Sequence, residues 1–122
     1  MKEYSFEKLN FWNQIRNLIK SIYLIIKTFP DEERFGLSSQ MRRAAISVSS
    51  NIAEGTSRSS YKDQAHFSQI AYSSLMELLS QLILAKDLNY INEFTYKETR
   101  ELIEELSRQI NALRKSQLNR IK

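Results

Sequence analysis

The chain contains only two glycines and one proline in 122 residues. Tight turns and β-hairpins depend on these two residue types, so this chain has few places at which it can reverse direction. Long helices need the fewest reversals for a given length, and the remaining composition is rich in Leu, Ile, Lys, Glu, Gln and Ser. The sequence therefore predicts an all-α fold.

Apolar residues recur at spacings of three and four in four segments, which is the pattern of helices with one buried face. In the first segment the repeat comprises Phe11, Ile15, Leu18, Ile22, Ile25 and Phe29. We expect helices over about 5–29, 38–54, 60–87 and 95–115. Short connections between long helices force antiparallel neighbours, so the sequence predicts one domain, 1–122, folded as an up-down-up-down four-helix bundle.

Several residues have the chemistry of helix boundaries. Candidate N-caps have side-chain oxygens that accept a bond from a free backbone N–H, and they are Ser5, Ser38 or Ser39, Ser60 with Asp63, and Thr95 with Glu98. Pro30 should stop the first helix, because the residue before a proline avoids helical geometry. Gly55 should end the second helix in a left-handed C-terminal cap.

The residues needed for most enzymatic sites are missing. The chain has no cysteine, and His66 is its single histidine. A di-metal bundle needs several carboxylates with Glu-x-x-His pairs, and no phosphate-cradling or nucleophile-elbow motif is present. We therefore expect no catalysis, no metal and no cofactor. The N-terminus lacks a signal-peptide pattern, and Lys20, Lys27 and Gln81 interrupt the longest apolar stretches, so we expect a cytoplasmic protein without a membrane partner.

The formal charge of +4 is unevenly placed along the chain. No acidic residue lies between Glu7 and Asp31, and none follows Glu105. The first and last helices of an up-down bundle adjoin, so their cations can form one surface for the phosphates of RNA or DNA. The alternative explanation for the C-terminal cations is that they offset the dipole of the last helix. The nucleic-acid candidates are Lys8, Arg16, Lys20, Lys27, Arg108, Arg114 and Lys115.

The second predicted helix carries a polar stripe of short side chains. On a helical wheel Gln40, Arg43, Ser47, Ser50, Asn51 and Glu54 fall on one side. Ser and Asn disfavour helix interiors, so hydrogen bonds from a neighbouring helix or subunit should compensate them. The alternative is that Asn51, Glu54 and Gly55 merely end the helix and that Arg43 is an ordinary surface residue. The candidates for an oligomer interface or structural motif are Gln40, Arg42, Arg43, Asn51, Glu54 and Gly55.

Two segments, ERFGLSSQMRRAAISVSSNIAEG and HFSQIAYSSLMELLSQLILAKDLNYI, make the chain resemble a known bacterial family. It is the four-helix-bundle family of the intervening-sequence protein encoded within large-subunit ribosomal RNA genes, which also includes the accessory variability determinant of diversity-generating retroelements. The resemblance extends from Phe6 to about Leu113. It departs from the family pattern at Tyr72, where a basic residue is expected, and at Ser49 and Ser50, where Pro and Ala are common. The resemblance implies a four-helix protomer, a ring-like homopentamer, a basic surface for nucleic acid and, in the retroelement branch, a complex with a reverse transcriptase.

Three hypotheses for function remain. The first is a non-catalytic accessory assembly that binds nucleic acid through phosphates. The second is a protein-interaction scaffold of the intervening-sequence type without a direct role on nucleic acid, with Tyr4, Phe6, Trp12 and Tyr72 as anchors if they are exposed. The third is a toxin, antitoxin or other small regulatory bundle, which needs a specific partner or a catalytic residue.

Overall fold

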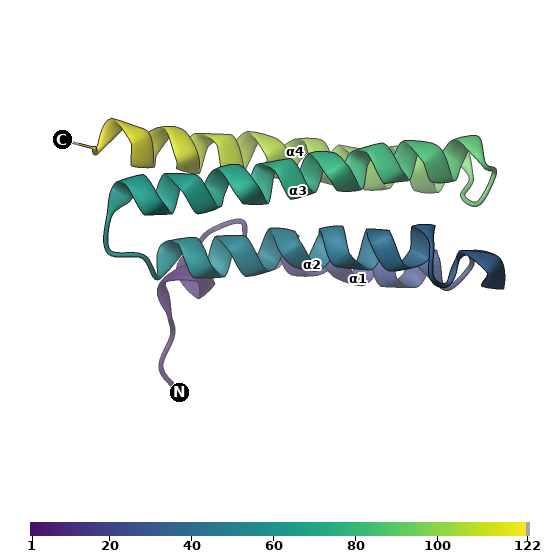
Figure 1. The fold of residues 1–122 in the computed structure, drawn as a ribbon, viewed down its shortest axis with the longest axis horizontal. Helices are drawn as coiled ribbons and strands as arrows, with labels where there is room; N and C mark the ends of the chain where they lie inside the picture. Colours follow the sequence, from purple (N-terminus) through teal and green to yellow (C-terminus); the bar gives the residue numbers. More distant parts are fainter. Residues whose placement is uncertain (122) are drawn as a thin grey trace.

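The computed structural model describes residues 1–121, and Lys122, the last residue of the expected domain, lies outside the described residues. The described chain folds into four helices and no strand: α1 (Trp12–Ile26), α2 (Leu37–Thr56), α3 (Tyr61–Asp87) and α4 (Glu93–Asn119). The helices alternate in direction, with α1 and α2 in one layer and α3 and α4 in the other, and both termini lie at the same end (Figure 1). The prediction of an all-α four-helix bundle is confirmed.

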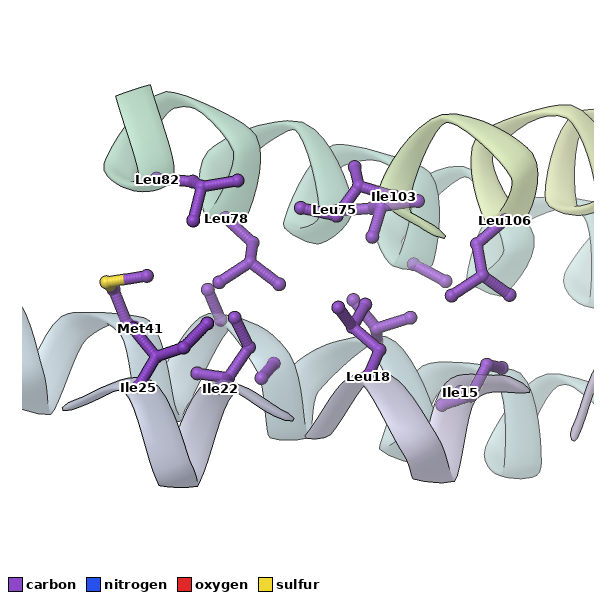
Figure 2. Packing of buried hydrophobic residues seen from close by; sticks show 14 of the residues in the cluster. Ile15, Leu18, Ile22, Ile25, Met41, Leu75, Leu78, Leu82, Ile103 and Leu106 are labelled. Carbon is purple, nitrogen blue, oxygen red and sulfur yellow. The ribbon is translucent and has the colours of Figure 1, made fainter. Parts of the chain in front are cut away.

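The core lies between the two layers. Figure 2 shows the side chains of α1 and α2 pointing toward those of α3 and α4. The apolar repeat predicted for the first segment is buried throughout, from Phe11 to Phe29. The largest fully buried side chains are Ile15, Leu18, Ile22, Met41, Val48, Ile52, Leu75, Leu78, Leu82, Ile103, Leu106 and Ile110.

The first helix is shorter than the predicted span of 5–29. Residues Ser5–Lys8 form a short 3₁₀ helix, η1, in which the Tyr4 N–H donates to Oε1 of Glu7 at 2.9 Å. Leu9 is extended (φ −64°, ψ 132°), so the chain bends before α1 begins. This bend brings the Phe6 ring edge-on to Trp12, with ring centroids 4.8 Å apart. The contact between these two rings holds the N-terminal segment against the start of α1. The spacing of apolar residues cannot show such a bend, because it assumes one straight helix.

Both boundaries of α2 differ from the prediction. Its N-cap is Gly36, and the Leu37 N–H donates to Oε1 of Glu33 at 3.1 Å, whereas Ser38 is a buried residue inside the helix. A serine cap is not needed here, because the Glu33 carboxylate, at the end of the preceding 3₁₀ helix η2 (Asp31–Glu33), already accepts a bond from the first turn of α2.

Gly55 has a different role from the predicted left-handed cap. It lies within α2, and neither glycine has a positive φ. A Cβ atom at Gly55 would lie only 2.9 Å from Cβ of Phe67. The glycine is therefore required by the close approach of α2 to α3, since a larger residue would collide with α3.

The remaining boundaries are set by side-chain caps and one turn. Ser60 accepts the Asp63 N–H at 3.1 Å, as predicted for α3, but α4 is capped by Asn92, which accepts the Thr95 N–H at 2.7 Å. Between these helices Asn89 adopts a positive φ of 61°, and the Tyr90 N–H returns to the Ala85 carbonyl at 2.9 Å. This is a Schellman turn with asparagine in the left-handed position.

The α4 helix extends past the predicted end near residue 115 to Asn119. Gln117 is buried in this added turn and its Oε1 accepts a hydrogen bond from the Ser68 hydroxyl at 2.7 Å. The four helices also differ in how closely their backbones approach: α2 and α3 run close together, as do α3 and α4, whereas α1 has fewer close approaches to α2 and α4.

Candidate nucleic-acid interface

The seven predicted phosphate-binding cations lie on three elements. Lys8 ends η1, Arg16 and Lys20 lie in α1, and Lys27 is the C-cap of α1. The others, Arg108, Arg114 and Lys115, lie in α4. The two helices adjoin, since Nε2 of Gln109 donates to Oε1 of Gln14 at 2.9 Å.

The α1–α4 seam is not uniformly basic. The Gln14–Gln109 contact between antiparallel helices places the later residues of α1 beside the earlier residues of α4. That half of α4 exposes the carboxylates of Glu98, Glu101 and Glu104. The later cations of α1, Lys20 and Lys27, therefore lie alongside the half of α4 that carries these acidic residues.

Two of the three α4 cations are less available to a phosphate, because one is paired with a carboxylate and the other is half-buried. Arg108 donates to Oε2 of Glu105 at 2.6 Å, and this contact, with a second bond from Gln109, lowers the pKa of the Glu105 carboxyl below its usual value. Arg114 is half-buried, and its Nε is buried without a hydrogen-bond partner among the described residues. Lys8, at the end of η1, and Lys115, near the end of α4, are exposed.

The α1–α2 layer is the more consistently basic surface. No acidic residue lies from Lys8 to Pro30 or from Arg34 to Ala53. Arg16, Lys20, Lys27 and Arg43 are exposed and Arg42 is half-buried. None of these five forms an ion pair with another described residue. The second acid-free stretch is visible in the sequence, but Arg42 and Arg43 were predicted to belong to an oligomer interface or structural motif, and their place beside the α1 cations was missed.

An apolar groove runs between α1 and α2 within this layer. One hollow of about 510 Å³ is lined by Ile19, Lys20, Tyr23, Leu24 and Ile46, and a neighbouring hollow of about 460 Å³ by Tyr23, Arg42, Arg43, Ile46 and Ser47. The hollows share Tyr23 and Ile46, so together they form one surface, here called the α1–α2 groove. Tyr23, Leu24 and Ile46 are exposed by 38%, 64% and 42%. Cations from both helices therefore border an exposed apolar floor.

The polar stripe of α2 is largely satisfied within the chain. The Ser47 and Ser74 hydroxyls lie 2.8 Å apart across α2 and α3, and Nδ2 of Asn51 donates to the Ser47 carbonyl at 2.8 Å. Glu54 pairs with Arg58 at 3.3 Å. The neighbouring helix α3 supplies part of the predicted compensation, and Asn51 and Glu54 have partners without a second subunit.

Gln40 lies apart from this network, in a hollow between α2 and α3. This hollow, here called the α2–α3 hollow, is lined by Glu33, Leu37, Gln40, Gln81, Leu84, Asp87 and Leu88. Leu84 and Leu88 are each 52% exposed, and Oε1 of the buried Gln81 has no hydrogen-bond partner among the described residues. The two exposed leucines are apolar surface that a docked partner would remove from water.

Of the four proposed aromatic anchors, only Tyr4 is exposed, at 56%. Phe6, Trp12 and Tyr72 are half-buried, and the last two pack against the core. Within residues 1–121, no three His, Asp or Glu side chains gather as a metal site, and no helix has the length and apolar character to cross a membrane.

Comparisons with known proteins agree with this architecture. Residues 7–112 match the family model described as 23S rRNA-intervening sequence protein. A crystal structure of a protein with unknown function from the S23 ribosomal protein family of Bacteroides thetaiotaomicron VPI-5482 superposes with a TM-score of 0.78. The two chains are 22% identical over 84% of this chain and 96% of that chain, a likeness that shows the shared fold. No curated protein matches the chain.

Proposed function

The chain belongs to the 23S rRNA-intervening sequence protein family, and we propose that it is a non-catalytic accessory protein that binds nucleic acid as a ring-like homo-oligomer. The observation that carries this proposal is the acid-free α1–α2 layer with its five cations without ion-pair partners in the described chain. Side chains that already have carboxylate partners contribute little to a phosphate surface, whereas these cations are available.

The spacing of the α1 cations suits a polyanion. Arg16 and Lys27 are separated by about 16 Å along the helix axis at 1.5 Å per residue. A nucleic-acid strand has several phosphates within that length. Each phosphate that a cation neutralises releases condensed counterions. Contacts of this kind position a backbone without reading its bases, so we expect little sequence preference from them.

Assembly would multiply this surface. The family resemblance implies a pentamer, and five chains of +4 each carry +20. Repeated weak contacts on one ring raise the overall affinity for a long polyanion far above that of a single chain. The α2–α3 hollow supports self-association, because another copy would cover its exposed leucines, Leu84 and Leu88.

A more specific version of this proposal is that the protein forms a complex with a reverse transcriptase and holds nucleic acid for that enzyme. The scaffold hypothesis is the second candidate. It is favoured by the exposed apolar floor of the α1–α2 groove, which a protein partner could also cover.

A salt series of binding measurements tests the proposal. We expect the full chain, with its mass fixed by light scattering, to bind RNA and duplex DNA with an affinity that falls steeply as salt rises. Arg16→Ala combined with Arg43→Ala should reduce the salt slope, because two phosphate contacts are removed. The matched control, Arg108→Ala with Lys115→Ala, should have a smaller effect. Absence of binding even at low salt would overturn the proposal and favour the scaffold.

A further inference from the structure

We infer that the α1–α2 groove is a binding site for single-stranded nucleic acid, with a base stacked on Tyr23 and its flanking phosphates held by Lys20, Arg42 and Arg43. This inference rests on the proposed function, for which it names the class of ligand and the site.

The floor of the groove distinguishes a single strand from a duplex. Tyr23 lines both hollows, and the apolar side chains beside it are Ile19, Leu24 and Ile46. A duplex presents phosphates and sugars to a helical surface and keeps its bases stacked inside, so it would leave this floor facing water. A single strand has bases whose faces can pack on an aromatic ring and on aliphatic neighbours.

The positions of the cations match the same ligand. Lys20 borders the floor from α1, and Arg42 and Arg43 border it from α2. A base on Tyr23 would therefore have cations on both sides, where the phosphates of its own strand continue. Arginine suits this role because its planar guanidinium holds phosphate oxygens through two parallel hydrogen bonds.

An acidic amphipathic helix is the competing occupant of a groove with an apolar floor and basic rims. The extent of the charge favours the polyanion. Arg16 and Lys27 continue the line of cations along α1 to either side of the groove, and they are not among the residues that line its floor. The phosphates of a strand would follow this line of cations, whereas a helix anchored on the floor would leave Arg16 and Lys27 without a contact.

Three ligands of equal length test the inference. They are a 12-nucleotide mixed-sequence RNA, its duplex, and an abasic strand with the same number of phosphates, each measured by fluorescence anisotropy at fixed salt. We expect the single strand to bind about tenfold tighter than the abasic strand, the scale of one stacked base, and tighter than the duplex although the duplex carries about twice the phosphates. A DNA strand of the same sequence separates base stacking, which both nucleic acids share, from recognition of the 2′-hydroxyl.

Two substitutions at Tyr23 make the test specific. Tyr23→Leu keeps apolar surface but removes the ring, so it should abolish the preference for the single strand while leaving duplex binding unchanged. Tyr23→Phe keeps the ring and should bind like the parent chain. Tyr61→Leu, at a tyrosine of similar exposure at the start of α3, is the matched control and should change nothing. Circular dichroism confirms that each variant is folded.

The failures can be told apart. If all three ligands bind equally and Tyr23→Leu has no effect, the inference is overturned and the proposed function stands. If no ligand binds at low salt, both fall. If Tyr23→Leu instead lowers the mass of the assembly, or an acidic amphipathic peptide binds the groove more tightly than the strand, the groove is a protein interface and the inference is overturned.

Discussion

The Tyr90 hydroxyl donates a hydrogen bond to Oε2 of Glu33 at 2.7 Å, and so joins the α3–α4 turn to the segment that precedes α2. The other oxygen of the same carboxylate accepts the Leu37 N–H and caps α2. One side chain thus holds two connections at the same end of the bundle. The centroid of the Phe29 ring lies 5.1 Å from that of Tyr90 and adds the end of the first helical segment to this contact.

This contact predicts a pH-dependent stability. The bonds from Tyr90 and from the Leu37 N–H lower the pKa of Glu33 from its ordinary value of 4.5, so the unfolded chain binds this proton more readily than the folded chain. The stabilisation is present above the unfolded pKa and is lost as pH falls through the folded pKa. Tyr90→Phe should lower the melting temperature at pH 7, and the difference from the parent chain should shrink as the pH falls below the ordinary Glu value of 4.5. Glu32→Gln is the control, and an equal difference at every pH would contradict the assignment.

Gly55→Ala should destabilise the fold although alanine is the better helix former. The new Cβ would lie 2.9 Å from Cβ of Phe67, and overpacking of this kind costs about 1–3 kcal/mol. Alanine recovers about 1 kcal/mol of helix propensity, so we expect a net loss of up to about 2 kcal/mol in the free energy of unfolding, measured by urea titration. Ser50→Ala, an exposed position of the same helix, should be neutral or stabilising. A stabilised Gly55→Ala variant would show that α2 and α3 do not approach this closely.

The buried Ser68–Gln117 hydrogen bond should show strong coupling in a double-mutant cycle. Ser68→Ala leaves the Gln117 amide oxygen buried without its donor, at a cost of about 1–3 kcal/mol. With Gln117→Leu in the background, the same Ser68→Ala change should cost much less, because the amide that needed the donor is gone. Denaturant unfolding of the four chains measures the coupling. Additive losses would mean that the two side chains act independently.

Leu84→Glu should reduce the size of the proposed assembly and leave the fold intact. Leu84 is about half exposed in the α2–α3 hollow, so a charge there stays solvated in a free chain but opposes a second copy that covers it. Light scattering should report a lower mass than for the parent chain, and circular dichroism the same helix content. The matched control is Leu118→Glu on α4, which should keep the parent mass. An unchanged mass for Leu84→Glu would remove this hollow from the assembly interface.

The core was predictable from the sequence because it follows a local rule. A period of three and four placed Phe11 and Ile15 on the buried face without knowledge of their neighbours, and the Ser60 cap needed only the N–H three residues later. The wrong predictions concern residues whose structure depends on contacts with other parts of the fold. Gly55 is explained by Phe67 on another helix, and the start of α1 by the packing of Phe6 on Trp12.

The candidate site was only partly predictable for a related reason. The sequence shows which stretches lack acids, but the direction in which each cation points depends on how the helices are rotated in the bundle. Arg16 and Lys20 became candidates from their acid-free segment alone. The position of Arg42 and Arg43 across the groove from Lys20, and the acidic character of the facing half of α4, required the packing of three helices.

The limited contact of α1 with its neighbours has a consequence for dynamics. A helix with a lower density of contacts to its neighbours opens at a lower free energy than the rest, so its amide protons should exchange with solvent before those of α3. Arg16, Lys20 and Tyr23 all lie on this helix. A ligand that binds only the docked form of α1 stabilises it by mass action, so nucleic acid should slow amide exchange in α1 more than in α3 and α4. The element that recognises the ligand would then also be the one whose order depends on it.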